Sequence, residues 1–164
     1  MAQIDSDQPV LRIMQSLLDE KREDPAPGKG EASVTFITDR SRFILIKRNE
    51  RSDDPWSGQM ALPGGYRKRG ETSMDAAKRE AYEEVGVILE QLYYVGVYTS
   101  KVKEVEVKAF ISAVPSSVKP LAGNEISEAF WVPVRDLIKN SDSYLYGNYR
   151  IWGMTYRILL DILG

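Results

Sequence analysis

Residues 64–87 read GGYRKRGETSMDAAKREAYEEVGV, and the second half of this stretch has the spacing of an amphipathic helix. We predict the helix over residues 74–85. Thr72 lies three residues before Asp75, as in a capping pair at a helix N-terminus. Gly86 suits the C-terminus, because glycine tolerates the left-handed backbone that ends many helices. Local signals therefore bound this helix at both ends.

Three glutamates gather on one face of the predicted helix. With Glu80 set at zero and about 100° per residue, Glu84 lies at about 40° and Glu83 at about −60°. Like charges at this spacing repel by roughly a few tenths of a kcal/mol per pair, so the clustering of three carboxylates on one face requires an explanation. The face is either a solvated acidic surface or a site for a hard divalent cation, which takes carboxylate oxygens and bridges well to phosphate.

The other helix positions divide into a support for the glutamates and a core stripe. Arg79 can pair with Glu83 one turn further on, or reach back to Glu71. Ala76 and Ala77 flank the glutamates and are expected to leave open space above them for a ligand. The side chains expected in the core share a separate stripe, and they are Met74, Ala81 and Val85.

The composition restricts the chemistry further. The chain of 164 residues has no cysteine and no histidine, which excludes thiolate and imidazole ligands and leaves carboxylates as the main acids and bases. Any bound metal must therefore take oxygen ligands, which suits Mg²⁺, Mn²⁺ or Ca²⁺. The net charge of −2 predicts no whole-chain attraction to a nucleic acid polymer or an anionic membrane. No signal peptide or long apolar run is visible, so we expect a cytoplasmic protein.

The remaining sequence predicts a single domain over residues 1–164, with strands and helices that do not alternate strictly. This order favours an α+β sandwich with a mixed central sheet over a doubly wound parallel sheet. The expected helices are 9–22, 134–140 and 150–163, and the expected strands are 32–38, 42–47, 88–99, 104–114 and 129–132. Residues 39–41 are expected to form a hairpin turn, and the expected irregular segments are 23–30, 48–59 and 116–123.

The polar and glycine positions of residues 64–87 resemble the Nudix box. The shared pattern is Gly65, five residues, Glu71, seven residues, and then Arg79-Glu80-x-x-Glu83-Glu84-x-Gly86-Val87. It covers eight positions within 23 residues, so a chance match is remote. The one departure is Ala81, where the family more often has a larger aliphatic residue, and this position carries no chemistry.

The resemblance implies an α/β/α sandwich that hydrolyses a nucleoside diphosphate linked to another group, with Mg²⁺ or Mn²⁺ as cofactor. Carried over from the family, the metal ligands are Glu80, Glu83 and Glu84, and Glu80 and Glu84 also take part in catalysis. The supporting residues are Gly64, Gly65, Glu71, Arg79 and Gly86. Among these, the glycine pair would let the backbone turn sharply and approach the phosphates, and Glu71 would pair with Arg79.

The general base of this family often lies on a later loop. Glu125 and Glu128 are the candidates in this chain. We favour Glu128, because the family often has a glutamate just before the strand predicted at residues 129–132. A charge at the edge of a strand is the alternative role for Glu128.

The segments on either side of the box resemble coenzyme A pyrophosphatases. Upstream, the chain keeps Leu45, Arg48, Gly58, Gln59, Pro63, Gly64 and Gly65 of that signature, but departs from it at Ile44, Ile46, Asn49 and Leu62. Downstream, residues 150–159 resemble the closing helix, although core packing explains several of them. The residues predicted to bind substrate are Arg48, Arg67, Gly58 and Gln59.

Three questions stay open at this point. The first is the substrate, which is coenzyme A or another small nucleotide such as ADP-ribose, a dinucleoside polyphosphate or a damaged nucleoside triphosphate. A Nudix-fold binding module without catalysis is a different class, although no box glutamate is lost. The amphipathic helix at 9–22 covers either a sheet face of its own chain or a partner in a homodimer.

Overall fold

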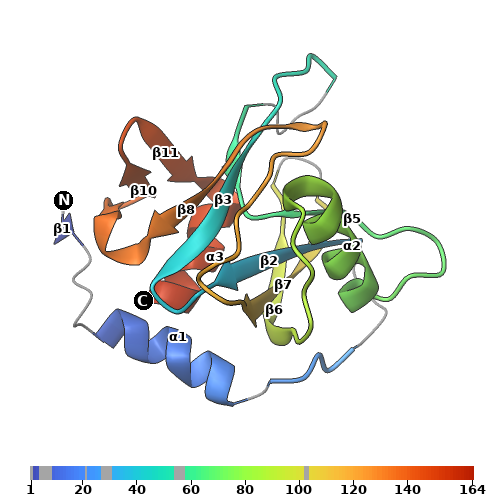
Figure 1. Cartoon of the computed structure of the whole chain (residues 1–164), viewed down its shortest axis with the longest axis horizontal. Coiled ribbons are helices and arrows are strands. Elements are labelled where there is room, and N and C mark those ends of the chain that lie inside the picture. Colours follow the sequence, from blue (N-terminus) through green and yellow to red (C-terminus); the bar gives the residue numbers. More distant parts are fainter. Residues whose placement is uncertain (1, 4–8, 21, 27–30, 54–57, 102–103) are drawn as a thin grey trace.

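The computed structural model describes residues 2–3, 9–20, 22–26, 31–53, 58–101 and 104–164. Its main sheet has the order β4-β3-β2-β7-β6, with β5 paired to β2 and β8 paired to β3 (Figure 1). These strands are β2 Ala32–Thr38, β3 Arg42–Arg48, β4 Met60–Ala61, β5 Gly64–Tyr66, β6 Tyr93–Thr99, β7 Glu106–Ala113 and β8 Ile126–Pro133. Since β2 runs parallel to β7 and antiparallel to β5, the sheet is mixed, as predicted.

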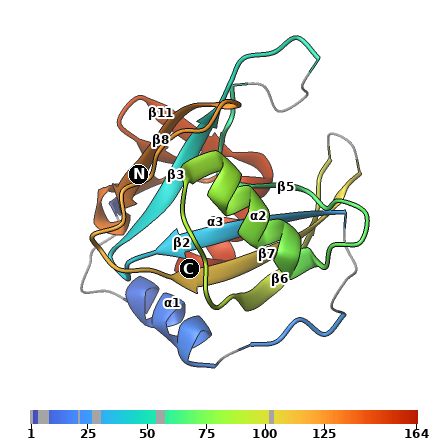
Figure 2. The same ribbon diagram turned by 45° about the vertical axis from the view of Figure 1, so that its right-hand side comes forward.

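Helices cover both faces of this sheet, with α2 on one side and α3 on the other (Figure 2). The helices are α1 Pro9–Asp19, α2 Ser73–Val85 and α3 Gly153–Leu163. One apolar cluster joins α1 and α3 to the sheet, and a second joins α2 to the opposite face. The predicted α+β sandwich is therefore confirmed. Within the described part of the chain, no helix is long and apolar enough to cross a membrane.

The N-terminal helix packs against its own chain. Met14 and Leu18 are buried in the cluster with α3, so this part of α1 needs no second subunit to cover it. The helix ends at Asp19, three residues before the predicted end at residue 22. The side chains of Val10 and Ile13, which belong to the same apolar stripe, lie outside the described residues.

The segment that follows α1 is held by a buried ion pair. Lys108 Nζ on β7 lies 2.8 Å from Asp24 Oδ2, and the two side chains are 3% and 2% exposed. Lys108 also donates to the carbonyl of Ala26, and the amide of Tyr94 donates to the carbonyl of Arg22. The predicted linker at 23–30 is irregular as expected over its described residues 23–26, but those residues are fixed to the sheet.

The C-terminal quarter differs most from the prediction, because it contributes three strands to a second sheet. These strands are β9 Ile138–Lys139, β10 Ser143–Tyr146 and β11 Tyr149–Trp152, and the N-terminal strand β1 Ala2–Gln3 pairs with β9. The predicted helix 134–140 is only a 3-10 turn, Val134–Asp136, followed by β9. The predicted helix 150–163 starts late, since residues 149–152 pair with β10 and Gly153, with φ +66°, begins α3. Strand pairing here overrides the helical spacing of the sequence.

Candidate active site

Helix α2 has both caps that its sequence predicts. The Thr72 hydroxyl accepts from the amide of Asp75, and the Asp75 carboxylate accepts from the amide of Thr72, which completes a capping box. Gly86 ends the helix with φ +70°. The prediction for Ala76 and Ala77 was wrong, because both are buried against the sheet and leave no space for a ligand. Their small side chains instead let α2 approach β2 and β5 closely.

Glu84 is buried beside β5. Its side chain is 7% exposed, and Oε1 accepts a hydrogen bond of 2.6 Å from the amide of Gly64. The Arg48 guanidinium lies close by, with Nη1 3.7 Å from Oε2. Burial raises the pKa of Glu84 to about 8, with a further contribution from the charge of Glu80 and a partial offset from the Gly64 amide. The carboxylate is therefore costly to ionise without another positive charge.

Glu80 lies one turn before Glu84 and contacts the next residue of β5. A Cβ at Gly65 would lie 2.7 Å from Cδ of Glu80, so a side chain at this position would displace the carboxylate from β5. Gly64 has a related constraint, since a Cβ there would lie 2.1 Å from the carbonyl oxygen of Ser33. Both glycines are extended strand residues rather than a sharp turn. Burial also raises the pKa of Glu80, although the hydrogen bond from Arg79 opposes the shift.

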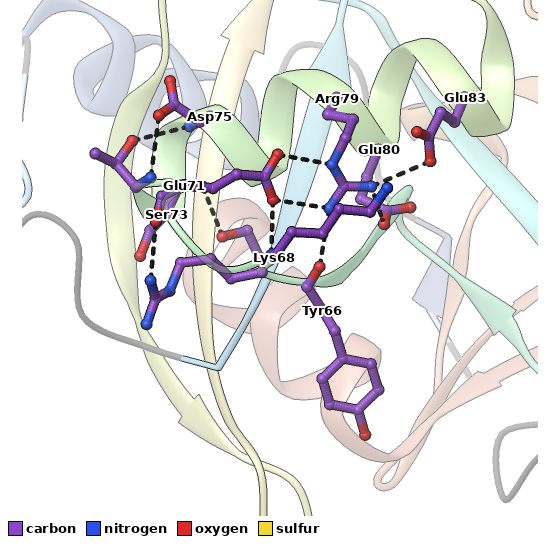
Figure 3. Close-up of polar contacts among 11 residues, drawn as sticks. Tyr66, Lys68, Glu71, Ser73, Asp75, Arg79, Glu80 and Glu83 are labelled. Carbon is purple, nitrogen blue, oxygen red and sulfur yellow. Dashed lines mark hydrogen bonds and ion pairs between the residues drawn. The ribbon is translucent and has the colours of Figure 1, made fainter.

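Arg79 binds both to the loop before α2 and to glutamates within α2 (Figure 3). Its Nε and Nη2 donate to the two oxygens of Glu71 at 2.7 and 3.0 Å, and Nη2 also donates to the carbonyl of Tyr66 at 2.9 Å. Nη1 donates to Glu80 at 2.8 Å and to Glu83 at 3.1 Å. The hydrogen bond from Arg79 lowers the pKa of Glu71, so the pair is charged at neutral pH. Both partners that the sequence offered to Arg79 are therefore used.

We expect Arg79→Lys to lower the free energy of unfolding by about 1–2 kcal/mol, because an ammonium cannot bridge both oxygens of Glu71 and the Tyr66 carbonyl. The melting temperature should fall by roughly 2–8 °C. Thermal unfolding followed by circular dichroism measures this. Arg69→Lys, on an exposed side chain of the same loop, is the control. Equal melting temperatures for the two variants would contradict the bridging role.

The side chains of Glu80, Glu83 and Glu84 do not converge on one point. Glu80 and Glu84 meet at β5, whereas Glu83 is half exposed and turned toward Arg79. Among the described residues, no three carboxylates converge closely enough to hold a metal ion. The donor set nevertheless suits a hard divalent cation, since burial raises the pKa values of Glu80 and Glu84 even though Arg79 and Arg48 lie beside them. Such a cation would replace part of the role that Arg79 has toward Glu80 and Glu83.

Outside the box, the two candidate glutamates, Glu125 and Glu128, differ in their surroundings. Strand β8 begins at Ile126, three residues before the prediction, so the glutamate just before it is Glu125. The charge of Glu125 contributes to the raised pKa values of both Glu80 and Glu84. Glu128 lies within the strand and accepts a 2.6 Å hydrogen bond from the Tyr149 hydroxyl.

Strand register explains why Glu128 points away from α2. Glu128 pairs with Lys47, and Ile126 pairs with Arg48, so Ser127 is an extra residue in β8. Cross-strand partners share a face of the sheet. Arg48 reaches Glu84 on the α2 side, and Glu128, paired with the preceding residue of β3, therefore faces the α3 side.

A cavity of about 390 Å³ lies between the sheet and α3, and Gly64 and Gly65 form part of its wall. Two of the predicted substrate-binding residues, Arg48 and Gln59, line it. Arg67 and Gly58 are not in its described lining: Arg67 donates to the carbonyl of Glu71 at 2.9 Å, and a Cβ at Gly58 would face Glu50. The sequence did not predict the apolar lining, which includes Val34, Leu62, Val107, Met154 and Ile158.

Comparisons with known proteins agree with this fold. The NUDIX domain matches residues 28–149. An uncharacterised protein of Schizosaccharomyces pombe is 35% identical over 115 residues, which make up 62% of this chain and 35% of that protein. A protein of Methanocaldococcus jannaschii named ADP-ribose pyrophosphatase is 31% identical over 109 residues, or 63% of this chain and 62% of its own length.

The likeness extends to solved structures. A MutT/nudix family protein of Enterococcus faecalis superposes with a TM-score of 0.64 at 16% identity, over 98% of this chain and 74% of that one. The chain spans about a third to three fifths of the length of the two relatives named above, with 35% and 62% covered. Since the NUDIX domain covers most of the sequence and contains both the glutamates and the glycine pair, this chain belongs to the NUDIX domain family.

Proposed function

We propose that this chain is a divalent-cation-dependent hydrolase of nucleoside diphosphates linked to a second group. One observation carries the proposal: the carboxylates of Glu84, which is buried, and of Glu80, which is 15% exposed, contact the glycine pair of β5, and the same glycines line the cavity. A diphosphate against Gly64 and Gly65 would therefore lie beside both carboxylates, with its second group in the cavity.

The residues divide the chemistry among themselves. Glu80 and Glu84, with Glu83, would hold Mg²⁺ or Mn²⁺, which when bound neutralises phosphate charge and makes water a better nucleophile. Glu125 is the carboxylate that we assign to proton transfer, since it lies close enough to influence Glu80 and Glu84 and is itself exposed. Arg48, 3.7 Å from Glu84 and in the cavity wall, would bind a phosphate oxygen.

We propose coenzyme A or a derivative as the substrate. Both segments that resemble coenzyme A pyrophosphatases contribute to the one cavity, through Arg48 and Gln59 upstream and through Trp152 and Gly153 downstream. Its mainly apolar lining suits a long, uncharged arm better than a second sugar phosphate. ADP-ribose is the alternative, favoured by the name of the Methanocaldococcus jannaschii relative.

The test is incubation of the purified protein and Mg²⁺ with each member of a substrate panel, followed by mass analysis of the products. The panel contains coenzyme A, ADP-ribose, NADH, diadenosine polyphosphates and nucleoside triphosphates. We expect 3′,5′-ADP and 4′-phosphopantetheine from coenzyme A. Cleavage of ADP-ribose alone would keep the hydrolase and reject the coenzyme A assignment. Nucleotide binding without turnover of any member, with Mg²⁺ or Mn²⁺, would instead indicate a binding module.

A further inference from the structure

The loop before β8 is attached to the C-terminal end of α2. The last carbonyls of a helix have no partner within it, and two of them accept hydrogen bonds from this loop. The amide of Leu121 donates to the carbonyl of Val85 at 3.0 Å, and the amide of Gly123 donates to the carbonyl of Glu84 at 2.9 Å. The loop therefore satisfies the helix end next to the box glutamates.

Gly123 makes the closest contact of this attachment. A Cβ at this position would lie 2.2 Å from the carbonyl oxygen of Glu83 and 3.5 Å from Cα of Glu84. Both are backbone atoms of α2, so neither can move aside as a flexible side chain would. Any side chain at position 123 must push the loop away from the helix.

Asn49 holds the same loop from the opposite side. Its amide donates to the carbonyl of Glu125 at 3.1 Å, and its side-chain Nδ2 donates to the carbonyl of Asn124 at 2.8 Å. Asn49 directly follows Arg48, whose guanidinium lies 3.7 Å from Glu84. Position 49 is also one of the departures from the coenzyme A pyrophosphatase signature, which has serine or alanine there.

We propose that Asn49 and Gly123 are positioning residues that hold Glu125 next to the box carboxylates of α2. The inference rests on the proposed hydrolase function for its effect on catalysis, whereas the attachment of the loop rests on the hydrogen bonds and close contacts given above. Residues 123–125 are fixed at one end to the helix that carries Glu80 and Glu84, and at the other end to Asn49. The carboxylate of Glu125 lies 3.6 Å from Nη1 of Arg51, within the same group of segments.

A double-mutant cycle tests whether Asn49 acts through Glu125. We expect Glu125→Gln to lower kcat on the order of 100-fold. Asn49→Ala, which removes the side-chain bond to the Asn124 carbonyl and keeps the backbone bond to the Glu125 carbonyl, should lower kcat about 10-fold with KM changed less than about twofold. The double variant should be no slower than Glu125→Gln alone, since a misplaced group and an absent one fail alike. Independent, multiplying losses, or full activity of Glu125→Gln, would overturn the proposal.

Ser127→Ala is the matched control. The Ser127 hydroxyl also joins β8 to β3, by a 3.1 Å hydrogen bond to the carbonyl of Lys47, but it does not hold residues 123–125. Its kcat should equal that of the wild type. Gly123→Ala should lower kcat at least as much as Asn49→Ala, whereas Gly96→Ala, where the nearest atom to a Cβ is 3.6 Å away, should not.

Amide hydrogen exchange tests the hold without any catalysis. The Gly123 amide should exchange about 10-fold faster in Asn49→Ala than in the wild type or Ser127→Ala. Unchanged exchange would overturn the positioning role, whatever the kinetics show. If the wild type cleaves no diphosphate, the proposed function fails, and the exchange of Gly123 still decides whether Asn49 holds the loop.

Discussion

Glu84→Gln is expected to lower kcat on the order of 1,000-fold while leaving the folded state at least as stable as the wild type. The loss of activity follows because a neutral amide is a poor ligand for a hard cation and cannot accept a proton. The stability follows from the surroundings of Glu84, which is buried and accepts a hydrogen bond from Gly64 that a glutamine oxygen can also accept. A variant that is inactive yet stable would separate function from folding at this position.

The difference in stability between Glu84→Gln and the wild type should depend on pH in the metal-free protein. Burial raises the pKa of Glu84 to about 8 in the folded state, so the folded state binds the proton more tightly than the unfolded chain does. The stabilising contribution of protonated Glu84 is therefore complete below the unfolded pKa and disappears as the pH rises toward 8. The glutamine in Glu84→Gln does not titrate and loses no such contribution. The melting temperature of the variant minus that of the wild type should therefore increase between pH 5 and pH 8.

Melting curves with EDTA and with Mg²⁺, together with steady-state kinetics, measure all of these effects. Mg²⁺ at about ten times its Kd should stabilise the wild type by about 1.4 kcal/mol, or roughly 3–6 °C, and should leave Glu84→Gln nearly unchanged. Glu90→Gln is the control, since Glu90 is exposed and lies outside the box. Retention of most of the kcat by Glu84→Gln would refute the assignment of this carboxylate.

Lys108→Ala is expected to be the most destabilising of the substitutions considered for the rest of the fold. It leaves the carboxylate of Asp24 buried without its cation, and removing one partner of such a pair costs about 3–5 kcal/mol. The melting temperature should fall by roughly 6–20 °C. The segment after α1 would lose its attachment to β7, so the cost includes the packing of residues 22–26.

A double replacement distinguishes the unpaired charge from a simple cavity. Asp24→Asn combined with Lys108→Met removes both charges and keeps most of the volume, so it should recover much of the lost stability. Arg135→Ala removes one partner of an exposed ion pair, 4.0 Å long, and should change stability by less than about 1 kcal/mol. If Lys108→Ala melts within a few degrees of the wild type, the buried pair contributes no more than an exposed one.

The local features of the box could be predicted because they depend on neighbours within about two turns of helix. The capping box at Thr72, the left-handed Gly86 and the pairing of Arg79 with Glu71 all involve residues at most eight positions apart. Side-chain direction on a helix follows directly from spacing, so the shared face of Glu80 and Glu84 could also be predicted. The elements that pack around the helix could not be predicted in this way, and Ala76 was wrongly expected to border a ligand.

The C-terminal quarter shows the limit of the same reasoning. Residues 150–152 fit a helical stripe and also fit a strand, and the choice depends on whether a partner strand is available. In the structure β10 provides that partner, and the helix begins only at Gly153. The cavity beside α3 depends on this late start, since Trp152 and Gly153 are both in its wall.

The sequence by itself determined that this chain carries the pattern of carboxylates and glycines that is typical of the Nudix box. The absence of histidine and cysteine and the spacing of Glu80, Glu83 and Glu84 are properties of the chain that no folding can alter. Tertiary structure alone decided where the later glutamates Glu125 and Glu128 lie relative to α2. The register of β8 against β3 puts Glu128 on the α3 side, the extra residue at Ser127 puts Ile126 on the α2 side, and a close contact ties Gly123 to α2. Strand pairing sets which face a side chain points to, and a bulge of one residue reverses it.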